Sequence, residues 1–323
     1  MQKVELHCHL DGLVDPPMLA ELKKRGLGAG MDPEALGAIV PVGSVEQWMG
    51  EYAAMVLPCL TPPERLGTHL EIHIQNLIRQ RVVYAEVMVS GMLLPLEGEA
   101  KVIERFVALR EIADRTAGGL TQVELLVAIG RGSRERAVRQ AGQILALKRE
   151  GLIAGVAIAG NETACTIESI ADLLDGFRGA GLGIEIHAGE FAGPESVWDA
   201  LTHGRPDRIG HGVRAFEDDG LLDELRRRDV HLEFCPSSNV CLGVVPDISR
   251  HPIVLAKTLG LNFSVNTDDP GPFGCDLDSE FRLLEEALGF VRPDFELIRA
   301  NAWRSRFGGS VTRHESNPSL GIC

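Results

Sequence analysis

The stretch VELHCHLDG, at residues 4–12, places two imidazoles and a carboxylate at every second position. Alternate side chains of a β-strand point to the same face, so His7, His9 and Asp11 would project together. Two imidazoles on one face can bind a metal ion, although a single H-x-H pair also occurs on ordinary surface strands. Other polar residues must therefore distinguish a metal site from a coincidence.

Three more motifs place histidine or carboxylate side chains directly after apolar, strand-like runs. HAGE contains His187 and Glu190, IGHG contains His211, and TDDP contains Asp268 and Asp269. Each residue alone has an ordinary explanation as a buried histidine or a turn aspartate. In a parallel barrel, however, the C-terminal ends of the strands meet at one rim, where these residues would form one site.

A catalytic zinc site has three protein ligands and an open position for water. The candidate ligands share a strand-end position and include no thiolate, which suits zinc: His7, His9, His187 and Asp268. Glu190, His211 and Asp269 then remain to transfer protons and to orient a substrate. A metal-activated water beside such groups indicates hydrolysis at a carbon centre.

The elements that would position these residues alternate along the chain. Strands are predicted at 3–9, 82–89, 123–129, 155–159, 183–188, 208–211, 231–235 and 261–266. Helical patterns lie between them, for example at 104–116, 134–150 and 217–228. Eight such units predict an α/β fold, a (β/α)8 TIM barrel with a helical insertion after the first strand. An open doubly wound sheet is the alternative, but no G-x-G-x-x-G follows the first strand.

The long segment 15–80 exceeds a single crossover helix, and we expect it to fold partly over the barrel mouth. Since no low-complexity linker interrupts the chain, we expect a single metal-dependent domain at 1–310. Residues 311–323 are polar and are predicted to form a C-terminal tail.

Composition limits the possible partners. The chain has 323 residues, 45% of them hydrophobic, and a formal net charge of −14. Polynucleotide binding requires a basic face, so this charge argues against a nucleic-acid partner. We find no apolar run of membrane-spanning length and no secretory leader. Seven cysteines without paired spacing are typical of a reducing compartment, so we expect a cytoplasmic protein that acts on a small molecule.

The motifs KVELHCHLDG, HAGE, RIGHG, LEFCPSSNVCLG and VNTDDPGPFG, in this order, resemble those of the adenosine deaminase family. The resemblance covers nearly the whole chain and ends with RANAWRSRF at 299–307. HAGE together with TDDP is highly specific. The resemblance implies a barrel of the amidohydrolase superfamily that hydrolyses the 6-amino group of a purine nucleoside, adenosine or 2′-deoxyadenosine, and releases ammonia.

The resemblance also implies roles for individual residues. One Zn²⁺ per subunit would be held by His7, His9, His187 and Asp268. Glu190 would protonate purine N1, and His211 would activate or orient the attacking water. The expected substrate-binding residues are His9, Asp11 at the ribose, Gly160 at N3 and Asp269 at N7.

Two positions depart from the family pattern. AIAGNE has Ala157 and Asn161 where the family usually has acids, and EVMVSG has Met88 and Gly91 in place of the arginine and proline of E-x-R-x-x-P. The substrate could therefore be another 6-aminopurine, namely adenine, aminodeoxyfutalosine or an N6-substituted adenine derivative.

Two other classes of protein remain as alternatives. One is a different amidohydrolase-type hydrolysis, although GVAIAGN lacks the lysine that bridges two metals in many such enzymes. The other is a catalytically inactive binding barrel. HLE at 231–233 imitates half of the cytidine deaminase motif and is interpreted as a strand, because no P-C-x-x-C follows. The sequence leaves open the choice of zinc, iron or cobalt and the oligomeric state.

Overall fold

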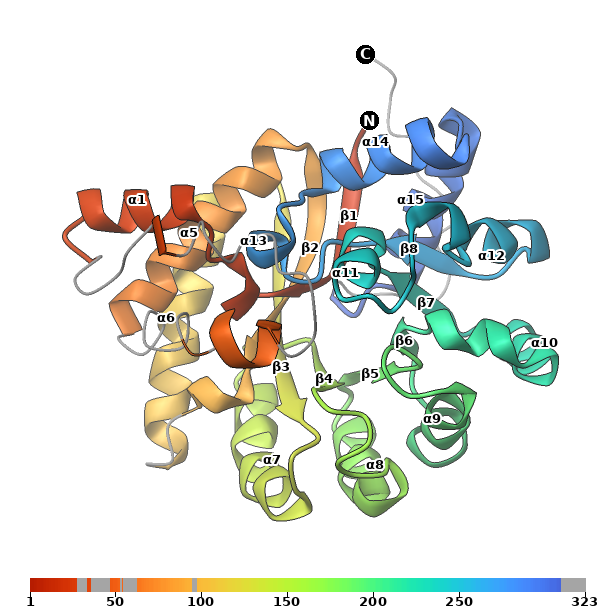
Figure 1. Cartoon of the computed structure of the whole chain (residues 1–323). Coiled ribbons are helices and arrows are strands. Elements are labelled where there is room, and N and C mark those ends of the chain that lie inside the picture. Colours follow the sequence, from red (N-terminus) through yellow and green to blue (C-terminus); the bar gives the residue numbers. More distant parts are fainter. Residues whose placement is uncertain (28–33, 36–46, 53, 55–62, 95–97, 309–323) are drawn as a thin grey trace.

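The computed structural model describes residues 1–27, 34–35, 47–52, 54, 63–94 and 98–308 (Figure 1). Its centre is one sheet of eight parallel strands in sequential order. The strands are β1 (Lys3–His9), β2 (Val82–Ser90), β3 (Gln122–Gly130), β4 (Gly155–Ala159), β5 (Gly183–Ala188), β6 (Arg208–His211), β7 (His231–Phe234) and β8 (Phe263–Val265). All eight predicted strands are therefore present.

The sheet closes on itself between β1 and β8. Cys8 and Asp268 form a parallel bridge. The His9 backbone N–H donates to the Asp268 carbonyl at 2.9 Å, and the Asp268 N–H donates to the His7 carbonyl at 3.0 Å. The (β/α)8 barrel predicted from the sequence is confirmed.

Helices surround the barrel, as Figure 1 shows. They are α1 (Pro16–Lys24), α5 (Pro63–Arg79), α6 (Glu99–Ala117), α7 (Arg134–Arg149), α8 (Ala171–Gly179), α9 (Pro194–Asp199), α10 (Asp219–Arg228), α11 (Pro236–Cys241), α12 (Ile253–Leu259), α13 (Pro270–Phe273), α14 (Leu277–Leu288) and α15 (Arg292–Ser305). The three helical patterns singled out in the sequence lie in α6, α7 and α10. Asp218 caps α10 and three arginines occupy its last turn, as the helix dipole favours.

The insertion after β1 contains α1, a π-helical turn at Trp48–Tyr52, and α5. The Trp48 side chain lies close enough to Asp269 to act on the pKa of that carboxyl. This part of the insertion therefore reaches the barrel mouth, as expected. Much of the remaining insertion and the tail at 311–323 lie outside the described residues, so the domain boundary at 310 stays a prediction.

The opposite end of the barrel is closed by the residues that follow α15. The Phe307 ring lies so close to Gly155 and Gly183 that a Cβ added to Gly183 would come within 2.2 Å of it. Inside the barrel, the Arg208 guanidinium stacks on Phe307 at 3.4 Å from the ring centroid. These contacts seal the floor of the barrel beneath the site.

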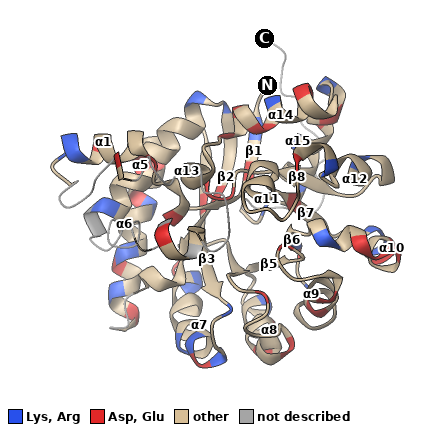
Figure 2. Ribbon diagram, viewed as in Figure 1, with Lys and Arg blue, Asp and Glu red and all other residues tan. Residues whose placement is uncertain are grey.

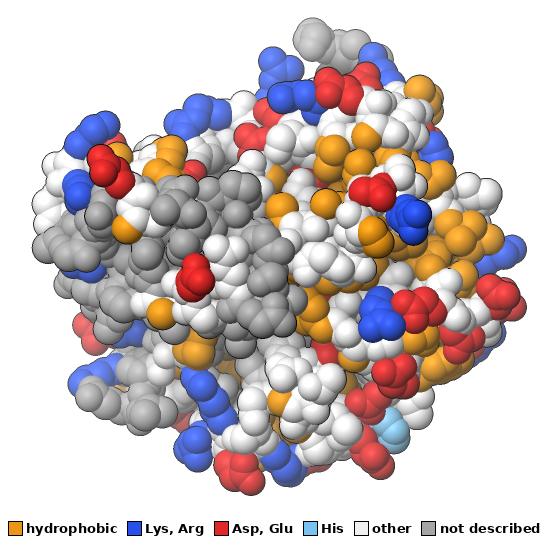
Figure 3. Space-filling view, in the orientation of Figure 1, with side chains coloured by type: hydrophobic (Ala, Val, Ile, Leu, Met, Phe, Trp, Pro, Cys, Tyr) orange, Lys and Arg blue, Asp and Glu red, His pale blue; other side chains and the backbone are white. Residues whose placement is uncertain are grey.

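Charged residues of both signs are interspersed along the outer helices (Figure 2). On the face in Figure 3, the basic side chains do not form a continuous patch, and hydrophobic side chains gather near α11 and α12. No helix in the described ranges combines the length and apolar character that a membrane span requires.

Candidate active site

A β-bulge shapes the end of β1. Between the pairs that Glu5 and Cys8 form with β2, two residues of β1, Leu6 and His7, lie opposite a single residue. A bulge bends its strand and changes the direction of its side chains. The strict alternation expected from the sequence is therefore interrupted before His7, although His7 and His9 still reach the same carboxylate.

Asp268 and three imidazoles converge where the barrel closes. Asp268 Oδ1 lies 3.4 Å from His7 Nε2 and 3.5 Å from His9 Nε2. The Nε2 atoms of His9 and His187 are 3.2 Å apart. Burial lowers the pKa of His9 to about 4 and that of His187 to about 3, so both rings are neutral at pH 7. Facing neutral imidazole nitrogens beside a carboxylate fit a bound metal ion, because metal ligands must be deprotonated.

His211 lies beside this group. One ring nitrogen of His211, one each of His7 and His187, and a carboxylate oxygen of Asp268 lie within 4.8 Å of one another. His211 ends β6 with φ +60°, in the left-handed region. A non-glycine residue in this conformation is uncommon and is a feature of functional sites.

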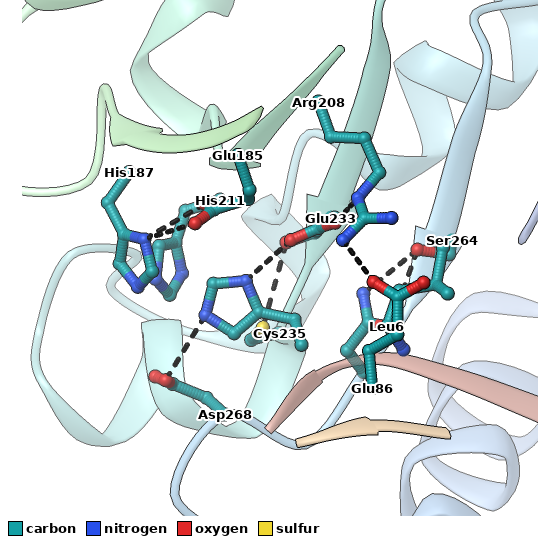
Figure 4. Close-up of polar contacts among 12 residues, drawn as sticks. Leu6, Glu86, Glu185, His187, Arg208, His211, Glu233, Cys235, Ser264 and Asp268 are labelled. Carbon is teal, nitrogen blue, oxygen red and sulfur yellow. Dashed lines mark hydrogen bonds and ion pairs between the residues drawn. The ribbon is translucent and has the colours of Figure 1, made fainter. Parts of the chain in front are cut away.

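Two buried carboxylates contact the far nitrogens of the imidazoles (Figure 4). Glu233 lies 2.8 Å from His7 Nδ1, and Glu185 lies 2.9 Å from His187 Nδ1. A carboxylate at Nδ1 accepts the ring N–H and directs the Nε2 lone pair to a metal. The sequence predicts the strand that contains Glu233, but neither of these two contacts.

Arg208 balances the charge of this carboxylate layer. Its fully buried guanidinium contacts Glu233 and lies 2.5 Å from Glu86 (Figure 4). Burial alone would raise the pKa of Glu233, but Arg208 and His7 outweigh it and lower the pKa to about 2. Glu233 is therefore an anion that accepts a hydrogen bond from His7.

The loop after β5 presents Glu190. The Glu162 carboxylate accepts hydrogen bonds from the backbone N–H groups of residues 189–191 at 2.7–2.8 Å. Glu190 is buried, and its Oε2 lies 3.6 Å from His211 Nε2. Burial raises the pKa of Glu190 well above its ordinary value, and the negative charge of Asp268 adds to this effect. The surroundings of Glu190 therefore favour its protonated form.

Asp11 and Asp269 lie next to each other at the mouth. Gly12 makes this approach possible, because a Cβ there would come within 1.7 Å of Asp269 Oδ1. Burial raises the pKa of both carboxyls, and Asp268 raises that of Asp269 further. Asp11 Oδ1 is buried, and it has no hydrogen-bond partner among the described residues.

Gly160 follows β4 with φ +87°, a conformation that favours glycine. A Cβ added to Gly160 would lie 3.7 Å from the backbone nitrogen of Arg131. Arg131 Nη2 in turn donates to the His187 carbonyl at 2.7 Å. The structure thus places Gly160 on the rim that carries His187.

The two departures from the family pattern meet in space. Met88 on β2 and Ala157 on β4 belong to one buried apolar cluster, together with Leu126 and Ala128 of β3. An acid introduced at 157 would face apolar side chains there. The two changes therefore form one local alteration of the barrel wall.

Residues 2–315 match the model of the family described as "Adenosine deaminase". The chain belongs to the adenosine deaminase family. It is accordingly an enzyme, a hydrolytic aminohydrolase, as the motifs predict.

Similar proteins support this assignment over the full length of the chain. The adenine deaminase of Rhizobium meliloti (strain 1021) is 33% identical over 338 residues, which cover 100% of this chain and 99% of that protein. The crystal structure of adenine deaminase from Arthrobacter aurescens superposes with a TM-score of 0.85 at 26% identity, covering 95% of this chain and 94% of that one. An amidohydrolase from Burkholderia ambifaria with bound Zn shares the fold, with a TM-score of 0.81 at 23% identity and coverage of 97% and 87%.

Proposed function

We propose that this adenosine deaminase family member hydrolyses the 6-amino group of free adenine and releases ammonia. The observation that carries the reaction is the convergence of the His7, His9 and His187 imidazoles and Asp268 beside the buried acid Glu190. Adenine is favoured over the nucleoside expected from the sequence, because full-length relatives at 30–33% identity carry the name adenine deaminase.

We assign one zinc ion to the set His7, His9, His187 and Asp268. When bound there, the metal would activate a water for attack on a ring carbon. Glu190 would donate its proton to purine N1, which makes C6 more electrophilic. Asp269, protonated through burial, would donate a hydrogen bond to N7.

Asp11 is compatible with either class of substrate. Its unpartnered buried oxygen requires a donor, since an unsatisfied buried acceptor costs about 1–3 kcal/mol. A ribose hydroxyl can donate to it in a nucleoside, whereas a ring N–H can do so in the free base. The aspartate therefore does not argue against adenine.

The test compares kcat/KM for adenine, adenosine, 2′-deoxyadenosine and an N6-methylated adenine, with formation of the 6-oxopurine as the readout and metal content measured in parallel. We expect adenine to exceed adenosine by at least tenfold, which corresponds to about 1.4 kcal/mol. Faster turnover of adenosine would restore the nucleoside as substrate. Absence of 6-oxopurine formation from all four by the zinc-loaded protein would refute the proposal.

A further inference from the structure

A chain of hydrogen bonds runs from the start of α12 to the back of His211. The Ile253 backbone nitrogen lies 3.2 Å from His251 Nδ1. His251 Nε2 lies 3.2 Å from Asn239 Oδ1, and Asn239 Nδ2 lies 3.2 Å from His211 Nδ1. The three side chains are buried, with exposed fractions of 3% or less.

The hydrogen bond between Ile253 and His251 fixes which group donates and which accepts in the other two hydrogen bonds. A backbone N–H can only donate, so His251 Nδ1 must carry a lone pair. The proton of neutral His251 is then on Nε2 and is donated to Asn239 Oδ1. The amide NH₂ of Asn239 consequently faces His211 and donates to its Nδ1.

A neutral His211 that accepts at Nδ1 carries its proton on Nε2. That nitrogen is on the side of the ring that faces Glu190, whose Oε2 lies 3.6 Å away. Each ring accepts a hydrogen bond at Nδ1, and a protonated imidazole has no lone pair there, so both rings are neutral. The reversed arrangement would put a His251 Nδ1–H against the Ile253 N–H, two donors facing each other.

We propose that Asn239 and His251 are positioning residues that hold His211 as its Nε2–H tautomer, so that it donates a hydrogen bond to the attacking water. The family resemblance is compatible with a His211 that either activates or orients the water. A ring with its proton on Nε2 has no lone pair there with which to take a proton, so His211 orients. This inference rests on the proposed function for the water, whereas the tautomer follows from the hydrogen bonds alone.

The test uses protein labelled with ¹⁵N in its histidine rings, because ring ¹⁵N shifts distinguish the two tautomers. Spectra are recorded without metal and with zinc added, and His211 is assigned from the signal lost in His211→Gln. We expect His211 and His251 to be Nε2–H tautomers in the unmodified protein. An Nδ1–H tautomer of His211 would overturn the proposal.

Asn239→Asp is the decisive variant, because it is isosteric and its carboxylate can only accept. It should convert His211 to the Nδ1–H tautomer and lower kcat at least tenfold, with KM and zinc content nearly unchanged. A wrong tautomer of a catalytic histidine costs about 10⁴-fold in the serine protease triad. An unchanged tautomer or an unchanged kcat in folded Asn239→Asp would contradict the proposal.

A second pair of variants covers the case in which Asn239→Asp does not fold. His251→Gln can still donate to Asn239 and should retain most of kcat, whereas His251→Leu should lose it. His231→Leu is the matched control, since His231 is equally buried and makes two hydrogen bonds elsewhere, to Asn262 and Ser264. Equal kcat for the two His251 variants would refute the proposal. The expected tautomer in a protein that deaminates no purine would refute only the proposed function.

Discussion

Cys8 lies opposite Asp268 in the bridge that closes the barrel, so three of the four residues that we assign to the metal lie in this bridge or next to it. His7 and His9 belong to the first strand, and Asp268 follows the last. A metal bound by them would join two ends of the barrel that are about 260 residues apart in sequence.

We therefore expect zinc to stabilise the fold through the closure between β1 and β8. Zinc at 100 times its dissociation constant should raise the free energy of unfolding by about 2.7 kcal/mol. His187→Ala should lose both the bound metal and the shift of Tm on adding zinc, whereas His203→Ala, outside the cluster, should keep both. Thermal unfolding with and without chelator, together with metal analysis, checks this. A metal-loaded His187→Ala protein would contradict the ligand assignment.

Glu190→Gln should separate metal binding from proton transfer. The variant should bind zinc and substrate but lose kcat by about 10²-fold or more, the usual cost of a missing general acid. In the unmodified enzyme kcat should fall at alkaline pH, because the raised pKa of Glu190 means that its proton is lost only there. Glu217→Gln, an exposed change, is the control. Turnover of Glu190→Gln close to normal would exclude the role.

Gly210→Ala should disturb the metal site without altering any charge. The new Cβ would lie 2.2 Å from Glu185 Oε1 and must displace that carboxylate from His187. Loss of such an orienting contact typically costs 10–100-fold in metal affinity, and we expect a similar rise in the zinc Kd. Competition with a chromophoric chelator measures it. Gly176→Ala, which meets no atom within 4 Å, should leave the Kd unchanged.

Glu280 should make stability depend on pH. Burial raises its pKa from 4.5 to about 7, so the folded protein binds an extra proton between these values. The contribution of Glu280 to the free energy of unfolding is then fully present below pH 4.5. It decreases by about 3 kcal/mol as the pH rises to 7. Glu280→Gln should remove this contribution, while Glu286→Gln on the same helix should not. Denaturant unfolding at several pH values measures this contribution. An identical dependence of the free energy of unfolding on pH in both variants would disprove the assignment.

Gly183→Ala should loosen the barrel floor. Its methyl group would lie 2.2 Å from Phe307, and overpacking of this kind typically costs 1–3 kcal/mol. Zinc binding should persist, because the change lies at the opposite end of β5 from His187. Denaturant titration compares the free energy of unfolding of this variant with that of Gly179→Ala, whose added Cβ has no atom within 4 Å. Equal stability of the two variants would show that the floor can rearrange freely.

The sequence predicted the fold and the convergence of His7, His9, His187 and Asp268, because strand patterns are local and place these residues at strand ends. Their role as metal ligands stays a prediction. Apolar runs fixed the strands, and even so β8 is shorter than expected. It spans Phe263–Val265, and beyond it the Asn266 side chain accepts from the Leu6 backbone N–H and donates to the Phe234 carbonyl.

The supporting layer of the site could not be predicted in this way. Glu233 meets His7 across 226 positions of sequence, and nothing in the local pattern of β7 marks that pairing. Glu185 is at an alternate position from His187, where a strand pattern alone suggests only a shared face. Asn239 was inside a quoted motif, but its role depends on His251 and on a backbone donor that only the folded chain brings near.

The sealed floor has a consequence for traffic through the enzyme. Phe307 and Arg208 fill the barrel beneath the metal-binding residues, so water, purine and ammonia share the opening at the C-terminal ends of the strands. Water must then reach the site through the same opening as the purine. The 6-oxopurine and ammonia must likewise leave by the opening through which the purine enters.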